Sequence, residues 1–347
     1  MPDDETEHRA LSPGGRGKHA TRTRTGRRRA VPALLGACAA IVVIAGASFA
    51  VSESESDTAA QGSAAIQTRV PSTGPTKAAS ATPVSTSSAH SRGAATSRRP
   101  ARLRRNPFGT TATAYLSTRA GVVLAAVHDI STGRTWQLGK GPPQHEASVV
   151  KLDVLETLLG EQKGTGLSDS DRSLTQQMME NSDNDAATSL WYQVGGATRI
   201  RSFNTAAGLA DTSPSSCVNC PGFPWPGWGL TTTTPADQLI LLRNLVEPSP
   251  LLTNAERSYA LSLMENVTPA QRWGISGGVP PQVTVALKNG WLPLDSAGAD
   301  WQVNSVGWVS GQGRDYLMAV LTTGNPNEQD GIDTIDELAA LVWQDMN

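Results

Sequence analysis

The feature that most constrains this chain is an apolar run near its N-terminus. Residues Val31–Val51 carry no charge, and as a helix they are long enough to span a hydrocarbon core of about 30 Å. Basic residues precede the run, and such residues stay on the cytoplasmic side of a membrane. We therefore expect a basic cytoplasmic tail over 1–30, a transmembrane helix or signal anchor over 31–51, and everything that follows outside the cytoplasm. The basic residues are Arg22, Arg24, Arg27, Arg28 and Arg29.

Three processing alternatives compete with a retained single-pass anchor. Ala45-Gly46-Ala47 fits a signal-peptidase site, and Arg27-Arg28-Arg29 fits a twin-arginine signal. Leu35-Gly36-Ala37-Cys38 is similar to a lipoprotein signal, although apolar residues continue past Cys38. Length and hydropathy favour retention in the cell membrane, with secretion after cleavage as the alternative. Each option exports the C-terminal part of the chain.

The composition changes again after the apolar run. Residues 52–106 are rich in Ser, Thr, Ala and Pro and have few large apolar side chains, so burial cannot offset their ordering entropy and we expect a disordered linker. Its basic end either solubilises the linker or attracts an anionic cell-wall polymer. The arginines at that end are Arg98, Arg99, Arg102, Arg104 and Arg105.

Residues 107–347 form the part of the chain that can fold. They contain 13 Lys+Arg against 24 Asp+Glu, whereas residues 1–106 contain 16 against 7; this acidic balance argues against nucleic acid as a partner. The patterns predict one α/β (α+β) domain, an antiparallel sheet flanked by helices. The expected elements are a hairpin of Gly121–Asp129 and Arg134–Leu138, strands around Thr284, Gln302 and Tyr316, and a last helix from about Ile332, with Asp330 as its candidate cap, beside the hairpin.

Three cysteines are too few for a disulfide framework. Cys38 lies in the apolar run, and Cys217 and Cys220 form Cys-Val-Asn-Cys. That spacing serves redox chemistry or half a zinc site, but no second Cys or His pair lies nearby to complete four ligands. We therefore expect no metal or other cofactor. A local disulfide that pins a loop is the favoured interpretation for an exported domain.

The first motif with chemical content is Ser148-x-x-Lys151. Apolar residues follow Ser148 at helical spacing as far as Gly160, so we expect Ser148 at a helix N-terminus and Lys151 on the same face. Apolar neighbours desolvate the lysine and favour its neutral, basic form. Free backbone N–H groups at the helix start can hold an oxyanion. Alone, such a motif is usually an ordinary helix cap.

Two further motifs follow in order. Ser182-Asp183-Asn184 falls at a junction between two helical patterns, and the strand Thr284–Leu287 runs into Lys288-Asn289-Gly290. In addition, Leu230–Pro235 precedes an apolar helix over 236–245. With these motifs in this order, the chain from about residue 114 resembles the class A β-lactamases and related penicillin-binding proteins, which are penicillin-recognising serine hydrolases.

The resemblance implies a role for each motif residue. Ser148 would attack an amide or lactam carbonyl, Lys151 would take its proton, and Ser182 would pass a proton to the leaving nitrogen. Asn184 would hold the substrate amide, and Lys288 would attract its carboxylate, with Asn289 and Gly290 completing the strand motif beside the substrate. Backbone N–H groups of Ser148 and Trp291 would form the oxyanion hole. The substrate would be a β-lactam or a D-Ala-ended peptidoglycan peptide.

The chain departs from the family pattern at two places. Asn289 replaces the threonine whose hydroxyl the family offers to the substrate carboxylate. Counting back from Pro235 places the family's deacylating glutamate near Val218, yet residues 212–234 contain no Asp or Glu. Efficient lactam hydrolysis by the class A route is therefore in doubt.

Other features of the sequence allow different interpretations. Gly274-Ile275-Ser276-Gly277-Gly278 has the form of a nucleophile elbow, but an α/β-hydrolase needs a later histidine and the last one is His145. Scattered tryptophans are usually buried, and Trp225 and Trp228 are the best candidates to line a cleft. The alternative function is a weak or inactive wall- or antibiotic-binding module that keeps the pocket without turnover.

Overall fold

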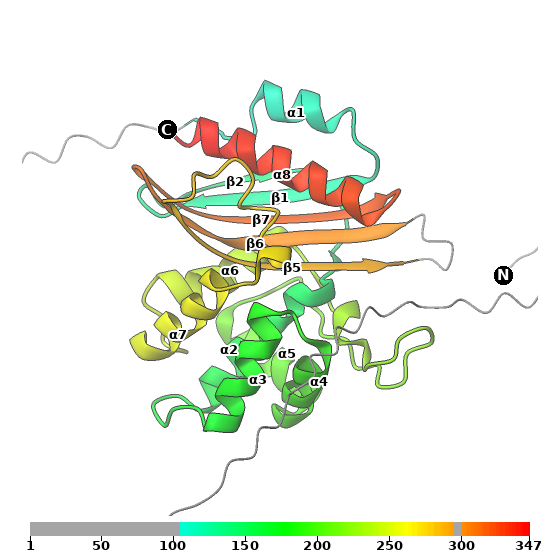
Figure 1. Ribbon diagram of the computed structural model, residues 1–347, viewed down its shortest axis with the longest axis vertical. Coiled ribbons are helices and arrows are strands. Elements are labelled where there is room, and N and C mark those ends of the chain that lie inside the picture. The colour runs from blue at the N-terminus through cyan, green and yellow to red at the C-terminus, as the bar shows by residue number, and fades with distance from the viewer. Residues whose placement is uncertain (1–104, 295–299) are drawn as a thin grey trace, which may run out of the picture. The chain divides into compact units, whose positions relative to one another are not determined.

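The fold is built on an antiparallel sheet of five strands, in the order β2-β1-β7-β6-β5 (Figure 1). The computed structural model describes residues 105–294 and 300–347. β1 pairs over its whole length with residues 316–323 of β7, so the beginning and the end of the domain meet in one sheet, as the sequence predicted. The strands are β1 (Val122–Asp129), β2 (Arg134–Leu138), β5 (Thr284–Pro293), β6 (Trp301–Gly311) and β7 (Arg314–Asn325); a separate pair joins β3 (Gln144–His145) to β4 (Thr232–Thr233).

The sheet has an apolar core on each face. Along β7, Leu317 and Ala319 belong to one core, whereas Tyr316, Met318 and Val320 belong to the other. Side chains alternate between faces along a strand, and both faces of β7 are covered. This explains why β7 is a continuous apolar run in sequence rather than an alternating one.

Helices cover the two faces unequally (Figure 1). α1 and α8 lie on one face, and the helices from α2 to α7 form a lobe on the other. The helices are α1 (Thr110–Leu116), α2 (Lys151–Glu161), α3 (Asp169–Glu180), α4 (Asn184–Gln193), α5 (Gly196–Ala207), α6 (Pro235–Val246), α7 (Asn254–Glu265) and α8 (Glu328–Asp345), with short 3-10 turns η1 (Ala147–Val150), η2 (Gly227–Leu230) and η3 (Pro269–Gln271).

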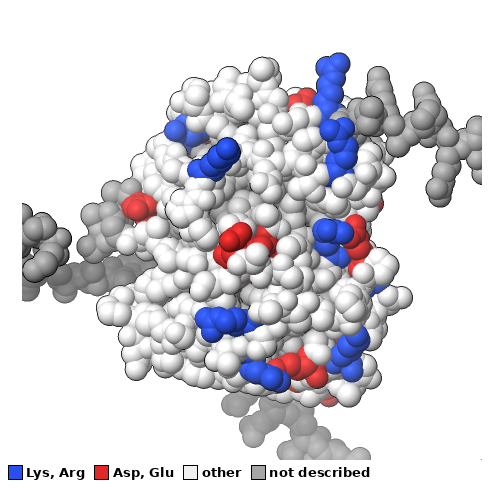
Figure 2. Space-filling view, turned by 180° about the vertical axis from the view of Figure 1, so that it is seen from behind, with Lys and Arg blue, Asp and Glu red and all other residues white. Residues whose placement is uncertain are grey.

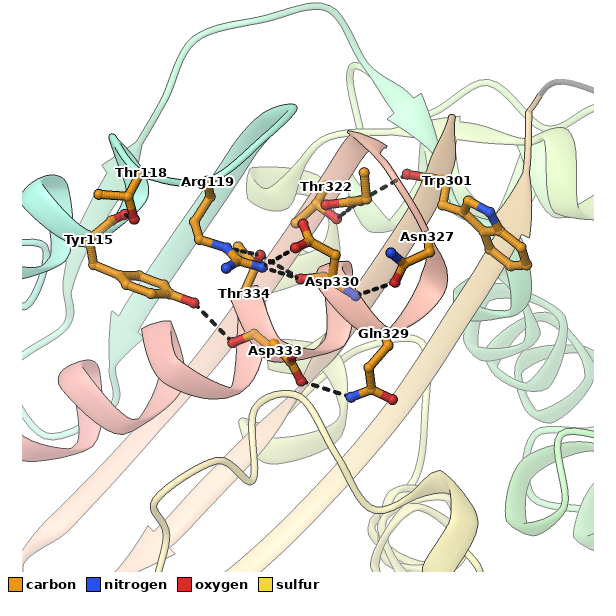
Figure 3. Close-up of polar contacts among 11 residues, drawn as sticks. Tyr115, Thr118, Arg119, Trp301, Thr322, Asn327, Gln329, Asp330, Asp333 and Thr334 are labelled. Atoms are coloured by element: carbon orange, nitrogen blue, oxygen red, sulfur yellow. Dashed lines mark hydrogen bonds and ion pairs between the residues drawn. The ribbon is translucent and has the colours of Figure 1, made fainter. Parts of the chain in front are cut away.

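Polar contacts fasten the start of the domain to its last helix (Figure 3). Arg119, just after α1, donates through Nη2 to the Asp330 carboxylate at 2.6 Å and through Nε to Thr334 Oγ1 at 2.9 Å. The Tyr115 hydroxyl donates to the carbonyl of Asp333 at 3.1 Å. These bonds hold α1 against the first turns of α8.

Two predicted helix ends were wrong. α8 begins at Glu328, before Ile332, because the Asn327 side chain caps it by accepting from the Asp330 N–H at 2.8 Å. α2 continues through Gly160 to Glu161. A Cβ at Gly160 would lie 2.8 Å from the Phe203 ring, so this glycine provides room for a neighbour rather than ending the helix.

The tail, the anchor and nearly all of the linker predicted from the sequence lie outside the described residues. Within 105–294 and 300–347, no helix combines the length and apolar character that crossing a bilayer requires. On the face of the domain in Figure 2, basic and acidic side chains alternate in small groups.

Candidate active site

Ser148 lies on η1, the tight turn that leads into α2. The preceding residue, Ala147, is buried and has a φ of 52°, a left-handed conformation that is strained for a residue with a Cβ. The turn packs directly on β5, where a Cβ at Gly290 would lie 2.5 Å from the Ser148 amide nitrogen. Glycine is therefore required at this point, and it lets the backbone of η1 approach β5 closely.

Lys151 opens α2 and is fully buried. Its Nζ is hydrogen-bonded to Ser182 O at 2.6 Å, Ser182 Oγ at 3.1 Å and Asn184 Oδ1 at 2.7 Å. Among the described residues, no hydrogen bond joins Lys151 to the Ser148 hydroxyl. Burial, helped by the positive charge of Lys288 and opposed by Asp183, lowers the pKa of Lys151 well below its ordinary value.

The Ser182-Asp183-Asn184 motif forms the turn between α3 and α4, as predicted. Asp183 caps α4 by accepting from the Ala186 N–H at 2.7 Å. Ser182 adopts a left-handed conformation with a φ of 56°. Cap and turn together direct both the serine hydroxyl and the asparagine carbonyl at Lys151.

Lys288 approaches the same serine from the sheet. Its ammonium donates to Ser182 Oγ at 2.9 Å and to Asn289 O at 2.8 Å, and the side chain is 1% exposed. Burial lowers the pKa of Lys288 from 10.5 to about 7. Ser182 Oγ therefore bridges two lysines whose neutral forms are favoured by desolvation.

Asn289 is oriented differently from its motif neighbours. Its amide Nδ2 donates to Gln271 O at 2.7 Å and Trp273 O at 3.0 Å, and the residue is fully buried. It does not border the cleft that Ser148 lines. The amide thus fixes the loop before β5 instead of facing a bound carboxylate.

The cleft beside Ser148 has a volume of about 910 Å³. One wall is the loop before η2, where Cys217 and Cys220 form the expected disulfide. Trp225 Nε1 donates to Asp185 Oδ1 at 3.1 Å, which ties this loop to α4. The cleft is lined by Ser148, Asn181, Ser182, Asn184, Pro221, Gly222, Phe223, Pro224, Trp225, Gln271, Trp291, Leu292, Pro293, Leu294 and Trp301.

Trp228 lies deeper than Trp225. The Lys151 ammonium is 5.1 Å from the centre of the Trp228 ring, and the indole N–H donates to Thr188 Oγ1 at 3.2 Å. Both tryptophans border a recess of about 80 Å³ that reaches Ser148. The prediction that tryptophans line the cleft is confirmed for Trp225, whereas Trp228 is buried and borders only the adjoining recess.

A pair of buried carboxyl groups behind the nucleophile was missed by the sequence reasoning. Glu146 and Asp153 are both fully buried, and Asn204 donates to Asp153 Oδ1 at 2.8 Å. Burial, then the charge of Asp153, raises the pKa of Glu146 well above its ordinary value; burial raises the pKa of Asp153 to about 6. The sequence offered one signal of this burial, an acidic residue at position 153 among the apolar residues of α2.

Nowhere in 105–294 and 300–347 do three metal-ligating side chains gather.

A helical lobe packed on an antiparallel sheet, with a serine and two lysines at their junction, defines a penicillin-recognising serine hydrolase-like domain. Residues 160–346 match the model of the beta-lactamase enzyme family, and the chain belongs to that family. The matched residues begin after Ser148 and Lys151.

Solved structures share this fold. They include TLA-1 extended-spectrum β-lactamase, with a TM-score of 0.61 and 18% identity over 68% of this chain and 96% of that one. Another is a class A β-lactamase from Bacteroides cellulosilyticus, with a TM-score of 0.59 and 18% identity over 70% and 99%. At such identities the likeness shows the fold alone: a β-lactamase-like α/β fold whose antiparallel sheet is flanked by helices.

A curated relative in Mycobacterium tuberculosis, named "Putative lipoprotein LppW", is 29% identical over 203 residues, which cover 56% of this chain and 61% of the relative. The same match is found in Mycobacterium bovis. The chain thus spans about three fifths of the length of these curated relatives.

Proposed function

We propose that residues 107–347 form a serine hydrolase or acyltransferase that reacts through an acyl-enzyme on Ser148. The substrate is a β-lactam or a D-Ala-ended cell-wall peptide. The observation that carries this proposal is the junction at Ser182, whose hydroxyl contacts both Lys151 and Lys288 next to the cleft that Ser148 lines.

The acylation step uses these groups in turn. Neutral Lys151 accepts the Ser148 proton as the serine oxygen bonds to the substrate carbonyl carbon. The amide nitrogens of Ser148 and Trp291 stabilise the oxyanion. The carbon–nitrogen bond then breaks, and the proton passes from Lys151 through Ser182 to the leaving nitrogen. The geometry of Lys151 and Ser182, joined at 3.1 Å, supports this relay.

Deacylation is slow in this proposal. The recess beside Ser148 is walled mainly by apolar side chains, and no described residue that lines it is a carboxylate. A hydrolytic water needs about two to four polar partners, and Asn184 Oδ1 already accepts from Lys151. General-base assistance is worth about 10² to 10⁴ in rate, so its loss leaves the acyl-enzyme long-lived.

Intact-protein mass spectrometry with benzylpenicillin tests both steps. We expect a one-to-one adduct on the wild type that persists for hours, no adduct on Ser148→Ala, and a normal adduct on Ser170→Ala, a change at an exposed serine. Rapid return to the unmodified mass would contradict slow deacylation. Absence of any adduct would favour the non-catalytic wall- or antibiotic-binding module.

We further propose that the segment at 31–51 holds this domain at the outer face of the membrane through the linker at 52–106. The lipoprotein name of the mycobacterial relative supports an anchored, extracytoplasmic location. It also favours Cys38 as the point of attachment over an uncut helix. Metabolic labelling with an alkyne fatty acid decides between them: label lost in Cys38→Ser indicates a lipoprotein, and an unlabelled membrane-bound chain indicates a retained helix.

A further inference from the structure

The walls of the cleft carry an unusual concentration of aromatic side chains. Phe223 and Trp225 come from the loop between the Cys217–Cys220 disulfide and η2, Trp291 from β5 and Trp301 from β6. All four are partly exposed. Aromatic side chains that stay accessible together in one concave site mark a surface built to be covered by an apolar ligand.

Each wall is supported from behind by a second indole. Trp225 packs on Trp228 with ring centroids 6.4 Å apart, and Trp291 packs on Trp273 at 5.8 Å. The bond from Trp225 Nε1 to Asp185 fixes the first wall further. The aromatic surfaces are thus held in place before a ligand arrives, which lowers the entropy cost of binding.

The described lining of this cleft offers no partner for a charge on the ligand. None of its residues is Asp, Glu, Lys, Arg or His. Lys288 is recessed behind Ser182 at 1% exposure. The guanidinium of Arg272, next to Gln271, donates to the carbonyl of Glu265, and Asp185 accepts from Trp225. An ionised group against these walls would lose water without gaining a counter-charge.

We propose that this cleft selects acyl donors whose side chain beside the reacting carbonyl is bulky, apolar and uncharged, with the 221–225 loop and the 291–294 strand end as its two walls. The inference rests on the proposed function, because it names the substrate class of the Ser148 site. It assigns Phe223 and Trp225 as specificity-determining residues.

A series of penicillins on one nucleus tests the selectivity. The side chains are acetyl, phenylacetyl, 2-naphthylacetyl and α-carboxyphenylacetyl, and the readout is the second-order rate constant of Ser148 acylation by intact mass. We expect phenylacetyl to exceed acetyl by about 10- to 100-fold from the buried ring area. Naphthylacetyl should be at least as fast as phenylacetyl, and the added carboxylate should slow the reaction at least about tenfold.

Variants localise the effect. Trp225→Ala and Phe223→Ala should each reduce the phenylacetyl-to-acetyl rate ratio to below about 3, whereas Tyr192→Ala, an exposed aromatic residue on α4 outside the cleft, should keep it. Phe223→Lys should raise the absolute acylation rate of the α-carboxyphenylacetyl probe at least about threefold above that of the wild type, a gain that misfolding cannot produce. Equal rates for all side chains, or an unchanged ratio in Trp225→Ala, would overturn the inference while leaving the proposed function intact.

A chain that forms no adduct with any probe would contradict the proposed function, and the inference would then be decided by equilibrium binding. Ring-opened, unreactive forms of the same four penicillins would be titrated against tryptophan fluorescence. Tighter binding of the phenylacetyl and naphthylacetyl forms than of the acetyl form supports an apolar side-chain site; equal or undetectable binding of all four refutes it.

Discussion

Replacement of Lys288 by methionine should stabilise the fold in a pH-dependent way. The lysine is buried and has no carboxylate partner among the residues that the structure describes, and its pKa falls from 10.5 to about 7. At about 1.4 kcal/mol per pH unit, burying the charged form costs about 5 kcal/mol at pH 6. Methionine removes that cost but also the two hydrogen bonds to Ser182 and Asn289, worth about 1 kcal/mol each. Lys288→Met should therefore be about 3 kcal/mol more stable at pH 6.

The stability advantage of Lys288→Met should fall as the pH rises. Above pH 7 the folded lysine has lost its proton while the unfolded lysine keeps it up to about pH 10.5, so the unfolded state binds more protons and wild-type stability rises with pH. By pH 9 the residual cost is about 2 kcal/mol, and the advantage of Lys288→Met should shrink to about zero.

Urea unfolding of the purified protein at pH 6 and pH 9 measures this difference. Lys140→Met, at an exposed lysine, is the matched control and should show the same stability difference from wild type at both pH values. An advantage of Lys288→Met that does not change between the two pH values would refute the argument from desolvation, as would a variant less stable than wild type at pH 6.

Three other changes probe the remaining parts of the site and fold. Burial lowers the pKa of Lys151, so the acylation rate of Ser148 should rise with pH, with a midpoint well below pH 10.5. Lys151→Arg stays charged, and its acylation rate, measured by mass spectrometry, should be at least about 100-fold lower. Gly290→Ala places a Cβ 2.5 Å from the Ser148 nitrogen, so it should slow acylation at least about tenfold and lower the free energy of unfolding in urea by about 1–3 kcal/mol. Gly141→Ala is the control: its Cβ would lie 3.5 Å from the Leu124 side chain, an ordinary contact, and neither the acylation rate nor the stability should change. Arg119→Ala should cost about 1–2 kcal/mol of unfolding free energy with an unchanged acylation rate, and a loss of acylation would mean that α1 supports the site.

Local patterns in the sequence predicted the three motif positions well. Ser148 precedes a helical run, Ser182 separates two helices and Lys288 ends an apolar stretch, and each of these signals spans only about ten residues. The order of the three motifs along the chain resembles that of a known family, and this resemblance predicted that the distant motifs meet at one site. The five strands of the sheet were predictable in the same way, because each strand is indicated by a short stretch of sequence.

Contacts between distant segments were beyond the reach of the sequence. The orientation of Asn289 depends on the carbonyls of Gln271 and Trp273, which belong to a loop with no recognisable pattern. The buried acids Glu146 and Asp153 meet only because η1 turns sharply into α2. The apolar neighbours of Asp153 indicate its burial, but the neighbours of Glu146 in the sequence do not reveal that it too loses water, and so the raised pKa of Glu146 was not predictable.

The attachment of α1 to α8 has a mechanical consequence. A pulling force applied to the chain ahead of residue 105 is resisted first by the buried side chain of Phe108 and by α1, a helix of seven residues held through Ala112 in the core and through the side chains of Tyr115 and Arg119. Only after that does the load reach β1, which is paired on both sides in the sheet. The cleft adjoins β5, at the edge of the sheet away from β2, and faces the helical lobe. Under tension the segment that contains α1 should therefore peel from α8 before β1 is disturbed, while the cleft keeps its shape.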